Sequence, residues 1–295
     1  MQNSVQFRLI FLFSISFILL AGCNKNKDGE IPDTATSGSF ELVADETLRP
    51  AIDSLVAGFN LQTPNAKVTV RYKNATEALD DLIQHRARLV LIARPLSKKE
   101  HDLLSEQKIE LIEADVAENA IGCIVSYKSP LKAISMDSLK ALIQDKDKNF
   151  IRISSSYLSS TEFVLDSIFS LEKFQEGRIV RYQTSDSIIL KVRSDDHAIG
   201  FVNASWLKKL ANSGDSSVRV LRISQGSGRP IMMHLAYVLQ GLYPLTSRIC
   251  GYTTEVPNTL PRGFLAYAMS SDGQRVFLNY DLLPKTQILK LVPPQ

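Results

Sequence analysis

Residues 67–97 read KVTVRYKNATEALDDLIQHRARLVLIARPLS, and this stretch decides the fold class. It begins with an alternating β-type run at residues 67–72 and ends with an apolar run at residues 89–93. Apolar residues on both faces are typical of a central parallel strand. Between the two runs, Leu79, Leu82 and Ile83 recur at helical spacing. A strand, a helix and a second strand in this order predict a parallel β-α-β unit.

The same alternation continues on both sides of this unit. Upstream, residues 40–44 predict a strand, and the apolar stripe of residues 52–59 predicts a helix. Downstream, Ser97 and Glu100 form a capping box that begins another helix. The sequence therefore predicts a doubly wound α/β architecture.

The middle of the chain predicts a second α/β unit. Strands are expected at residues 109–116 and 121–127, separated by the polar pair Glu118-Asn119, where the chain can leave the first domain. Residues 128–220 repeat the alternation of strands and helices, and the last third returns to long apolar elements, including one at residues 231–239.

The N-terminus predicts export. Arg8 precedes an apolar run at residues 9–20, which is shorter than the roughly 20 residues that a spanning helix needs. The run ends in Leu20-Ala-Gly-Cys23, which resembles the lipobox of bacterial lipoproteins. We therefore expect a signal peptide at residues 1–22, lipidation of Cys23 and a flexible tether at residues 23–38.

Composition and motifs exclude several functions. The formal net charge of +3 and the lack of a basic stripe argue against a nucleic-acid partner. The four histidines fall at no metal-ligand spacing, and no P-loop, Gly-x-Gly-x-x-Gly or Gly-x-Ser-x-Gly motif occurs. We expect no cofactor, no metal, no catalytic residues and therefore no enzyme. Cys123 and Cys250 lie in apolar strands, and the sequence leaves open whether they pair or stay free.

Hydroxyl-bearing turns precede three predicted helices, at residues 45–48, 74–77 and 154–161. The first turn of a helix has unpaired N–H groups and a partial positive charge, so several such ends at one cleft would bind an oxyanion. Taken singly, each turn is better explained as an ordinary N-cap.

The order of these turns resembles the phosphate-binding proteins of bacterial ABC importers, a branch of the type II periplasmic binding proteins. Residues 68–97 match the second-loop segment of that family, and residues 198–202, 243–246 and 263–284 match later landmarks. The resemblance implies a two-lobed α/β fold with two hinge crossings. Lobe I would comprise residues 39–117 plus 221–295, and lobe II residues 118–220.

The resemblance also implies a ligand set. The positions that match the binding residues of the family, by hydroxyl or by main-chain N–H, are Thr47, Leu48, Ala75, Thr76, Ser159, Ser160 and Thr161. Two charged family positions differ, because Ala93 replaces an aspartate and Ser155 replaces an arginine. Arg94 can supply the missing cation, or it can form an ordinary salt bridge at the surface or between the lobes. Without the aspartate, we expect weaker discrimination between phosphate and sulfate.

The expected function is therefore capture of phosphate or a related small oxyanion by a monomeric, exported lipoprotein that delivers it to an ABC-type permease. One alternative is a sensor or scaffold lipoprotein that kept the fold and lost tight anion binding. Another, a phosphate-ester hydrolase, lacks a visible nucleophile–base pair.

Overall fold

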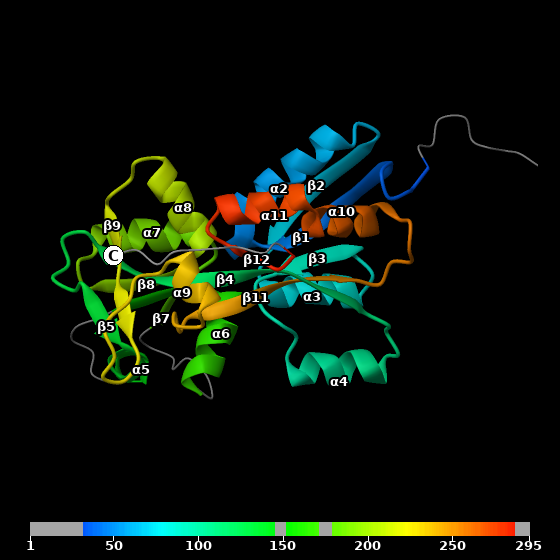
Figure 1. The fold of residues 1–295 in the computed structure, drawn as a ribbon. Helices are drawn as coiled ribbons and strands as arrows, with labels where there is room; N and C mark the ends of the chain where they lie inside the picture. Colours follow the sequence, from blue (N-terminus) through cyan, green and yellow to red (C-terminus); the bar gives the residue numbers. More distant parts are fainter. Residues whose placement is uncertain (1–31, 145–151, 171–178, 287–295) are drawn as a thin grey trace, which may run out of the picture. The chain divides into compact units, whose positions relative to one another are not determined.

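The computed structural model describes residues 32–144, 152–170 and 179–286, with backbone alone for residues 152–156, and its ribbon is drawn in Figure 1. The predicted signal peptide, Cys23 and most of the predicted tether lie outside these residues. Among the helices of the described part, none has the length and apolar character needed to cross a membrane.

One mixed sheet runs through the described chain in the order β2-β1-β3-β11-β4-β8-β6-β7. At one end, β1 pairs in parallel with β2 and with β3, as the β-α-β pattern predicts. All four residues of β3 are buried, which agrees with its place inside the sheet. The elements of this end, which we call lobe I, are β1 (Gly38–Asp45), η1 (Glu46–Leu48), α2 (Arg49–Gln62), β2 (Ala66–Lys73), α3 (Ala75–Ile83), β3 (Leu89–Ile92), α4 (Lys98–Glu106), β11 (Thr246–Thr253), α10 (Leu260–Met269), α11 (Ser271–Asn279) and β12 (Leu283–Pro284).

The strand β4 (Ile112–Ser126) joins this end of the sheet to the other. Its first part pairs with β11, and its second part, from Ile121 onward, pairs with β8. The prediction of two strands separated at Glu118-Asn119 is therefore wrong. Asn119 is buried, and its Nδ2 donates to Ser247 Oγ (3.2 Å), so a partner distant in the sequence bonds the amide nitrogen of this polar residue inside a continuous strand.

The other end of the sheet, which we call lobe II, contains a second set of strands and helices. The helix α8 was not predicted, and the predicted apolar element at residues 231–239 is helical only in α9. The elements of lobe II are β5 (Ala133–Ser135), α5 (Met136–Gln144), β6 (Arg152–Ser156), α6 (Ser160–Phe169), β7 (Ile179–Tyr182), α7 (Ser185–Ser194), β8 (Ala198–Asn203), α8 (Ala204–Asn212), β9 (Val218–Val220), β10 (Arg222–Ser224) and α9 (Leu235–Leu239).

We propose that the chain crosses between the lobes at two adjacent points. The first is Ala120-Ile121 within β4, where the pairing partner changes from β11 to β8. The second follows Leu245, whose carbonyl oxygen accepts a hydrogen bond from Ile121 N (2.8 Å). Since β10 pairs with β5, residues 221–245 accompany lobe II in this division, whereas the sequence assigned them to lobe I.

The residues just before β1 are held to lobe I. Asp33 pairs with Arg88, and its Oδ1 accepts a hydrogen bond from Leu260 N (3.0 Å) at the start of α10. A Cβ on Gly263 would lie 1.8 Å from Ala35 O, so the segment runs directly against the helix. Residues 33–37, which the sequence assigned to the tether, therefore belong to the folded body.

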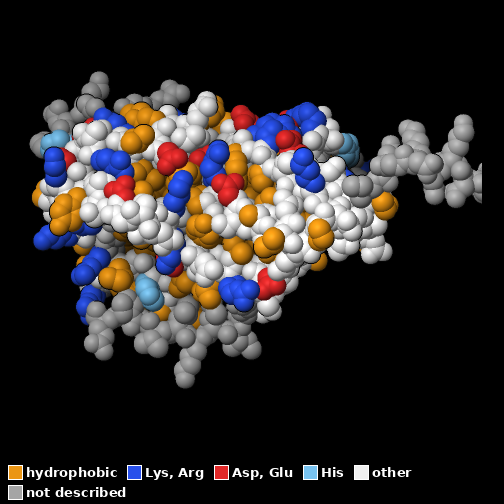
Figure 2. All heavy atoms as spheres, turned by 90° about the horizontal axis from the view of Figure 1, so that it is seen from above, with side chains coloured by type: hydrophobic (Ala, Val, Ile, Leu, Met, Phe, Trp, Pro, Cys, Tyr) orange, Lys and Arg blue, Asp and Glu red, His pale blue; other side chains and the backbone are white. Residues whose placement is uncertain are grey.

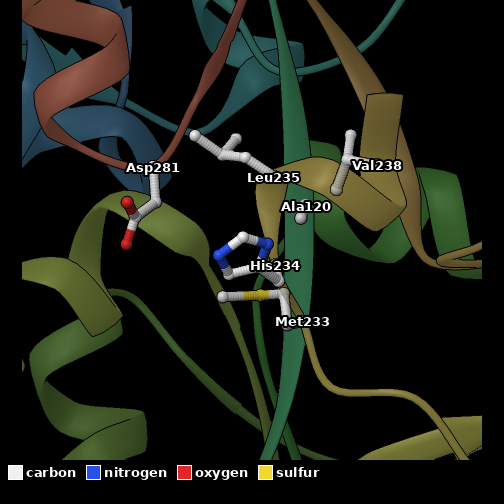
Figure 3. Close-up of a pocket in the computed structure, with 6 residues that line it drawn as sticks. All are labelled: Ala120, Met233, His234, Leu235, Val238 and Asp281. Atoms are coloured by element: carbon white, nitrogen blue, oxygen red, sulfur yellow. The ribbon is translucent and has the colours of Figure 1, made fainter. Parts of the chain in front are cut away.

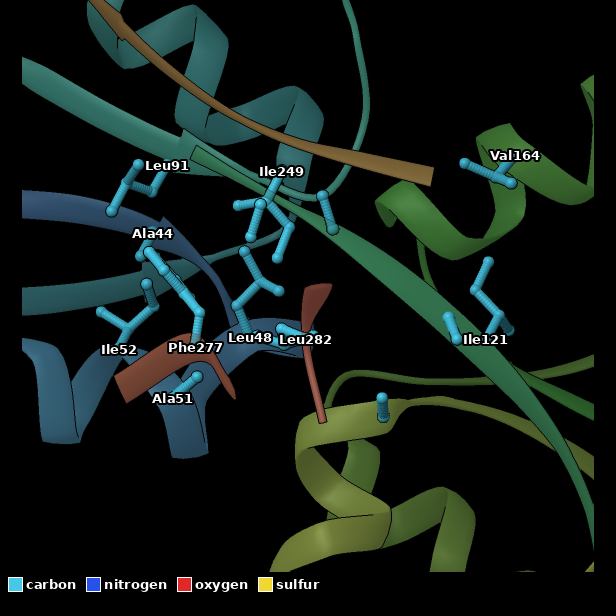
Figure 4. Close-up of a cluster of buried hydrophobic side chains, with 14 of the residues drawn as sticks. Ala44, Leu48, Ala51, Ile52, Leu91, Ile121, Val164, Ile249, Phe277 and Leu282 are labelled. Atoms are coloured by element: carbon cyan, nitrogen blue, oxygen red, sulfur yellow. The ribbon is translucent and has the colours of Figure 1, made fainter. Parts of the chain in front are cut away.

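Helices cover both faces of the sheet in each lobe (Figure 1). In lobe I, α2, α10 and α11 lie on one face, and α3 and α4 lie on the other. The largest buried cluster reaches across both lobes, because it contains Leu91 and Ile249 from one side and Ile121 and Val164 from the other (Figure 4). The lobes thus share a hydrophobic core around the strand that joins them.

Phe264 is the centre of the aromatic packing in lobe I. Its ring makes edge-to-face contacts with Phe40 (6.1 Å between centroids) and Phe59 (5.2 Å), and it is fully buried. This ring packs α10 against the sheet. Truncating the Phe264 side chain would therefore leave a cavity, because other contacts hold the surrounding residues in place.

We expect Phe264→Ala to lower the free energy of unfolding by about 3–5 kcal/mol in urea denaturation. Leu61→Ala is the matched control in the same lobe, since the Leu61 side chain is 84% exposed. The control should change the free energy by less than about 0.5 kcal/mol. Equal losses in the two variants would contradict the packing described here.

Candidate functional site

Turns at strand ends from both lobes meet in one polar interface. Each turn begins a helix or a 3₁₀ turn, so it brings first-turn N–H groups and hydroxyl groups to the same place. Hydrogen bonds join the lobes directly here. We call this region the lobe interface, and its members are Glu46, Thr47 and Ala93 from lobe I and Ser160, Thr161, Ser185 and Asn203 from lobe II.

Thr47 and Thr161 are connected through a residue that the sequence did not single out. Asn203 Nδ2 donates to Thr47 Oγ1 (2.9 Å), and Thr161 Oγ1 donates to Asn203 Oδ1 (3.4 Å). All three side chains are buried. Two predicted ligand positions, one from each lobe, are thus brought together by the last residue of β8.

Ser160 makes a second direct bridge. Its Oγ accepts a hydrogen bond from Ala93 N (3.1 Å), which lies at the end of β3 in lobe I. Ala93 is the position where the resembling family has an aspartate. The main chain at this position therefore meets a hydroxyl group that was itself predicted to bind the ligand.

The remaining predicted hydroxyls and main-chain positions lie at the edge of this network. Ser159 Oγ accepts from Glu162 N (3.3 Å) and so caps α6. Thr76 is exposed, and its Oγ1 is 3.5 Å from Leu158 O, at the limit of a hydrogen bond. Leu48 and Ala75 are fully buried in hydrophobic clusters, so they can offer a ligand only their main chain.

Arg94 forms a salt bridge within lobe I and a ring contact with lobe II. Its Nη2 and Nη1 donate to the two carboxylate oxygens of Glu100 (2.6 and 2.8 Å), and Nη1 also donates to Pro95 O (3.0 Å). The guanidinium lies over the ring of Phe163 from lobe II, 4.4 Å from its centroid. Arg94 thus forms a salt bridge, but the pair is buried and both of its members belong to lobe I. Among the described residues, no hydrogen bond joins the guanidinium to the predicted hydroxyls.

The ion pair with Arg94 also changes the pKa of Glu100. Burial on its own would raise the pKa of this carboxyl, but the hydrogen bonds and charge of Arg94 lower it below its ordinary value. Glu100 also accepts a hydrogen bond from Ser97 N (2.6 Å) as part of the capping box. One carboxylate therefore serves both the predicted helix cap and the guanidinium.

Two carboxylates beside Thr47 were not predicted as part of the site. Asp45 Oδ1 accepts from Thr47 N (3.1 Å), and Glu46 Oε2 accepts from both the N and the Oγ of Ser185 (3.0 Å each). Burial is the main reason why the pKa of Glu46 rises to about 7. An acid–hydroxyl pair separated by 139 residues leaves no local sequence signal, and this explains why Glu46 and Ser185 were missed.

A metal-ligand geometry occurs once among the described residues. Glu113, Asp115 and Cys250 bring one possible ligand atom each to within 4.8 Å of one another. Burial raises the pKa of the Cys250 thiol to about 12, so the thiolate that metals prefer is disfavoured at neutral pH. Arg248 Nη1 also pairs with Asp115 (3.1 Å), and we assign no metal to this cluster. Cys123 and Cys250 are both free and buried.

A small pocket of about 120 Å³ lies beside the hinge, lined by side chains from both lobes (Figure 3). Its lining residues are Ala120, Met233, His234, Leu235, Val238 and Asp281. Neither this pocket nor a hollow of about 630 Å³ beside Arg219 and Arg222 contains a predicted ligand residue. On the face in Figure 2, basic side chains lie in several separate groups with acidic ones among them.

Fold and interface together define a two-lobed protein whose lobes are joined at a hinge and meet at polar helix starts. The chain belongs to the PBP superfamily, since the family model of the PBP superfamily domain matches residues 31–272. It is 22% identical over 235 residues to the phosphate-binding protein PstS of Borreliella burgdorferi, covering 73% of this chain and 77% of that protein. The family predicted from the sequence is thus confirmed.

Solved structures agree on the fold. A Clostridium perfringens protein described as a phosphate ABC transporter substrate-binding protein, with bound phosphate, is 16% identical and has a TM-score of 0.72 over 84% of this chain and 100% of that one. An ABC-type phosphate transport receptor from Vibrio cholerae is 15% identical, with a TM-score of 0.63 over the same shares. The predicted fold class is confirmed.

We expect Arg94→Ala to lower the free energy of unfolding by about 3 kcal/mol, because it leaves Glu100 largely buried without its cation. The loss should shrink in acid. A carboxyl with a lowered folded-state pKa stabilises the protein above its ordinary pKa, and this contribution disappears as the pH falls through the folded-state value.

Denaturant titrations at neutral and acidic pH measure both effects. Arg275→Ala is the control, since Arg275 is 69% exposed and pairs with Asp272 at the surface. The control should cost at most about 1 kcal/mol. An Arg94 variant as stable as the control would contradict a structural role for the pair.

Proposed function

We propose that the protein is an exported solute-binding lipoprotein that captures phosphate or a related small oxyanion between its lobes and delivers it to an ABC-type permease. The observation that carries the proposal is the meeting of Thr47, Ser160 and Thr161 at one buried interface. Hydroxyl and N–H donors at helix starts are the groups that bind oxyanions in proteins. The relatives named above support the same ligand class.

Opening and closing would be the working motion. Apart from the contact of Glu46 with Ser185, the hydrogen bonds of the lobe interface join neutral groups, each worth about 1 kcal/mol. The two adjacent crossings at Ile121 and Leu245 leave the lobes free to separate around them. A bound oxyanion would take over the donors that now face each other, and the closed form would be recognised by the permease. No bond is made or broken in this scheme.

The lipid anchor at Cys23 would keep the protein beside the membrane. The predicted export signal ends immediately before this cysteine, and the folded body begins at Asp33 with its contacts to Arg88 and α10. A tether limited to residues 23–32 would span at most about 35 Å when extended. The binding protein would therefore work close to its permease, facing outward from a bacterial membrane.

The second candidate function is a sensor or scaffold lipoprotein without tight anion binding. It is favoured because candidate ligand groups already form hydrogen bonds with other groups of the protein. Ala93 N bonds to Ser160, and the Arg94 guanidinium is held by Glu100 and Pro95. An anion would have to displace the first of these bonds, and Arg94 gives it no free charge.

We expect isothermal titration calorimetry of the full chain to show phosphate binding, and Ser160→Ala to weaken it at least tenfold. A hydrogen bond to a charged group contributes about 1.5–3 kcal/mol, which corresponds to roughly tenfold or more in affinity. Ser138→Ala is the control in lobe II, because Ser138 is exposed and bonds to Ser135. Wild-type affinity in the Ser160 variant would exclude this residue from the site.

Sulfate in the same calorimetry tests the consequence of Ala93. We expect sulfate to bind measurably, since no acceptor at this position excludes a fully deprotonated oxyanion. Tight phosphate binding without any sulfate signal would refute this expectation. Absence of heat with both anions would favour the sensor or scaffold function.

We expect Cys23→Ser to move the protein from the membrane fraction to the aqueous phase of a detergent partition. Each buried CH₂ of an acyl chain contributes about 0.8 kcal/mol to membrane attachment, and the variant has no thiol to carry the lipid. Cys123→Ala, which removes a buried thiol, should stay in the membrane fraction. A Cys23 variant that still carries labelled fatty acid would show that the anchor lies elsewhere.

A further inference from the structure

A carboxylate of lobe I already occupies a helix start of lobe II. Glu46 Oε2 accepts hydrogen bonds from the backbone N and the Oγ of Ser185 (3.0 Å each), at the first residue of the ten-residue helix α7. Ser185 is buried, and Glu46 is 6% exposed. The first turn of a helix favours a negative charge, and here the chain supplies that charge itself.

The same carboxylate is incompletely satisfied. Glu46 Oε1 is buried and has no hydrogen-bond partner among the described residues. The cation that faces this oxygen is Arg49, whose Nε is 3.9 Å from Oε1 and whose guanidinium lies over the ring of Tyr72. A buried anion with one orphan oxygen is costly, so a structural contact alone does not account for an ionised glutamate at this position.

Further negative charge lies next to it. Asp45 is fully buried and also has an unpartnered oxygen, Oδ2. Both acids directly precede Thr47, a member of the proposed oxyanion site, in the sequence. The groups that surround Glu46 are Asp45 on its own turn, Arg49 on α2, Tyr72 on β2 with its partner Asp53, and the exposed Asp186 beside Ser185 on α7. An incoming oxyanion would meet two carboxylates and one partly exposed arginine.

We propose that Glu46 is an internal anion that competes with the ligand, so that capture of an oxyanion is coupled to uptake of one proton by its carboxyl group. This inference rests on the proposed function and adds a residue that sets the ligand's charge preference and the pH range of binding. Ionised Glu46 holds the start of α7 and repels a second anion. Protonated Glu46 removes that repulsion and supplies an O–H donor.

Burial brings the pKa of Glu46 close to neutral pH, where proton uptake can accompany ligand binding. Desolvation raises the pKa of Glu46 to about 7, with the charge of Asp45 acting in the same direction and the bonds from Ser185 in the opposite one. A dianion bound beside the carboxyl would raise this value further. Binding above neutral pH therefore draws a proton from solution, and affinity falls as the pH rises.

The decisive experiment is calorimetry with sulfate, which stays doubly charged across the range from about pH 6 to about pH 8.5 and brings no proton of its own. Titrations in buffers of different ionisation enthalpy count the protons taken up. For the wild type we expect uptake of about one proton above neutral pH, and an affinity that drops roughly tenfold per pH unit there. Glu46→Gln should bind without uptake and with a flat pH profile.

Glu41→Gln is the matched control, because Glu41 is 48% exposed in its pair with Arg71 and loses the same charge. It should keep the wild-type uptake. Uptake that persists in Glu46→Gln would overturn the inference while leaving the proposed function intact. If no variant binds sulfate or phosphate at any pH, both the proposed function and this inference fail.

A ligand-free measurement separates Glu46 from the rest of the site. A carboxyl whose pKa is raised in the folded state gives its full stabilisation below its ordinary pKa, and this contribution is lost as the pH rises from there through the folded-state value. The wild type should therefore lose more thermal stability between about pH 5 and about pH 8 than Glu46→Gln does. Parallel profiles for the two proteins would show that Glu46 does not titrate there and would overturn the inference.

Discussion

The structure depends on the unbroken pairing of β4. Along its fifteen residues the strand exchanges one set of partners for another, with β11 and β12 on the lobe I side and β8 and β9 on the lobe II side. Buried backbone N–H and C=O groups have to be paired, and this fixes the register of both lobes on a single strand. The turns that follow β1, β3 and β8 are therefore brought to the same interface by strands that share one sheet.

Much of the fold could be predicted because its signals are local. The capping box of Ser97 and Glu100 is present, and Asn74 and Ser159 cap the helices that their turns predicted. The continuity of β4 could not be predicted, because Glu118 and Asn119 look like a break in isolation. Their partners, Lys285 and Ser247, lie more than a hundred residues away.

The site was predictable to the extent that it consists of helix starts. Thr47, Ser160 and Thr161 were predicted and meet across the lobes, whereas Asn203, which joins two of them, ends a strand and has no recognisable motif. Arg94 shows the limit of local patterns. The sequence contains both the arginine and the capping glutamate six residues later, but it does not reveal that a single carboxylate serves the helix cap and the guanidinium together.

The polar interface combines weak and strong constraints. Hydrogen bonds between Thr47, Asn203 and Thr161 join neutral groups, so each costs little to exchange for water or for a ligand. The bond of Glu46 to Ser185 differs, because moving the carboxylate changes the charge of a buried region. In the proposed scheme, the hydrogen bonds between neutral groups fix how the lobes meet. The protonation state of Glu46 sets the pH range in which the closed lobes can hold a second negative charge. That division explains how the interface could contain a buried acid and still bind an anion as proposed.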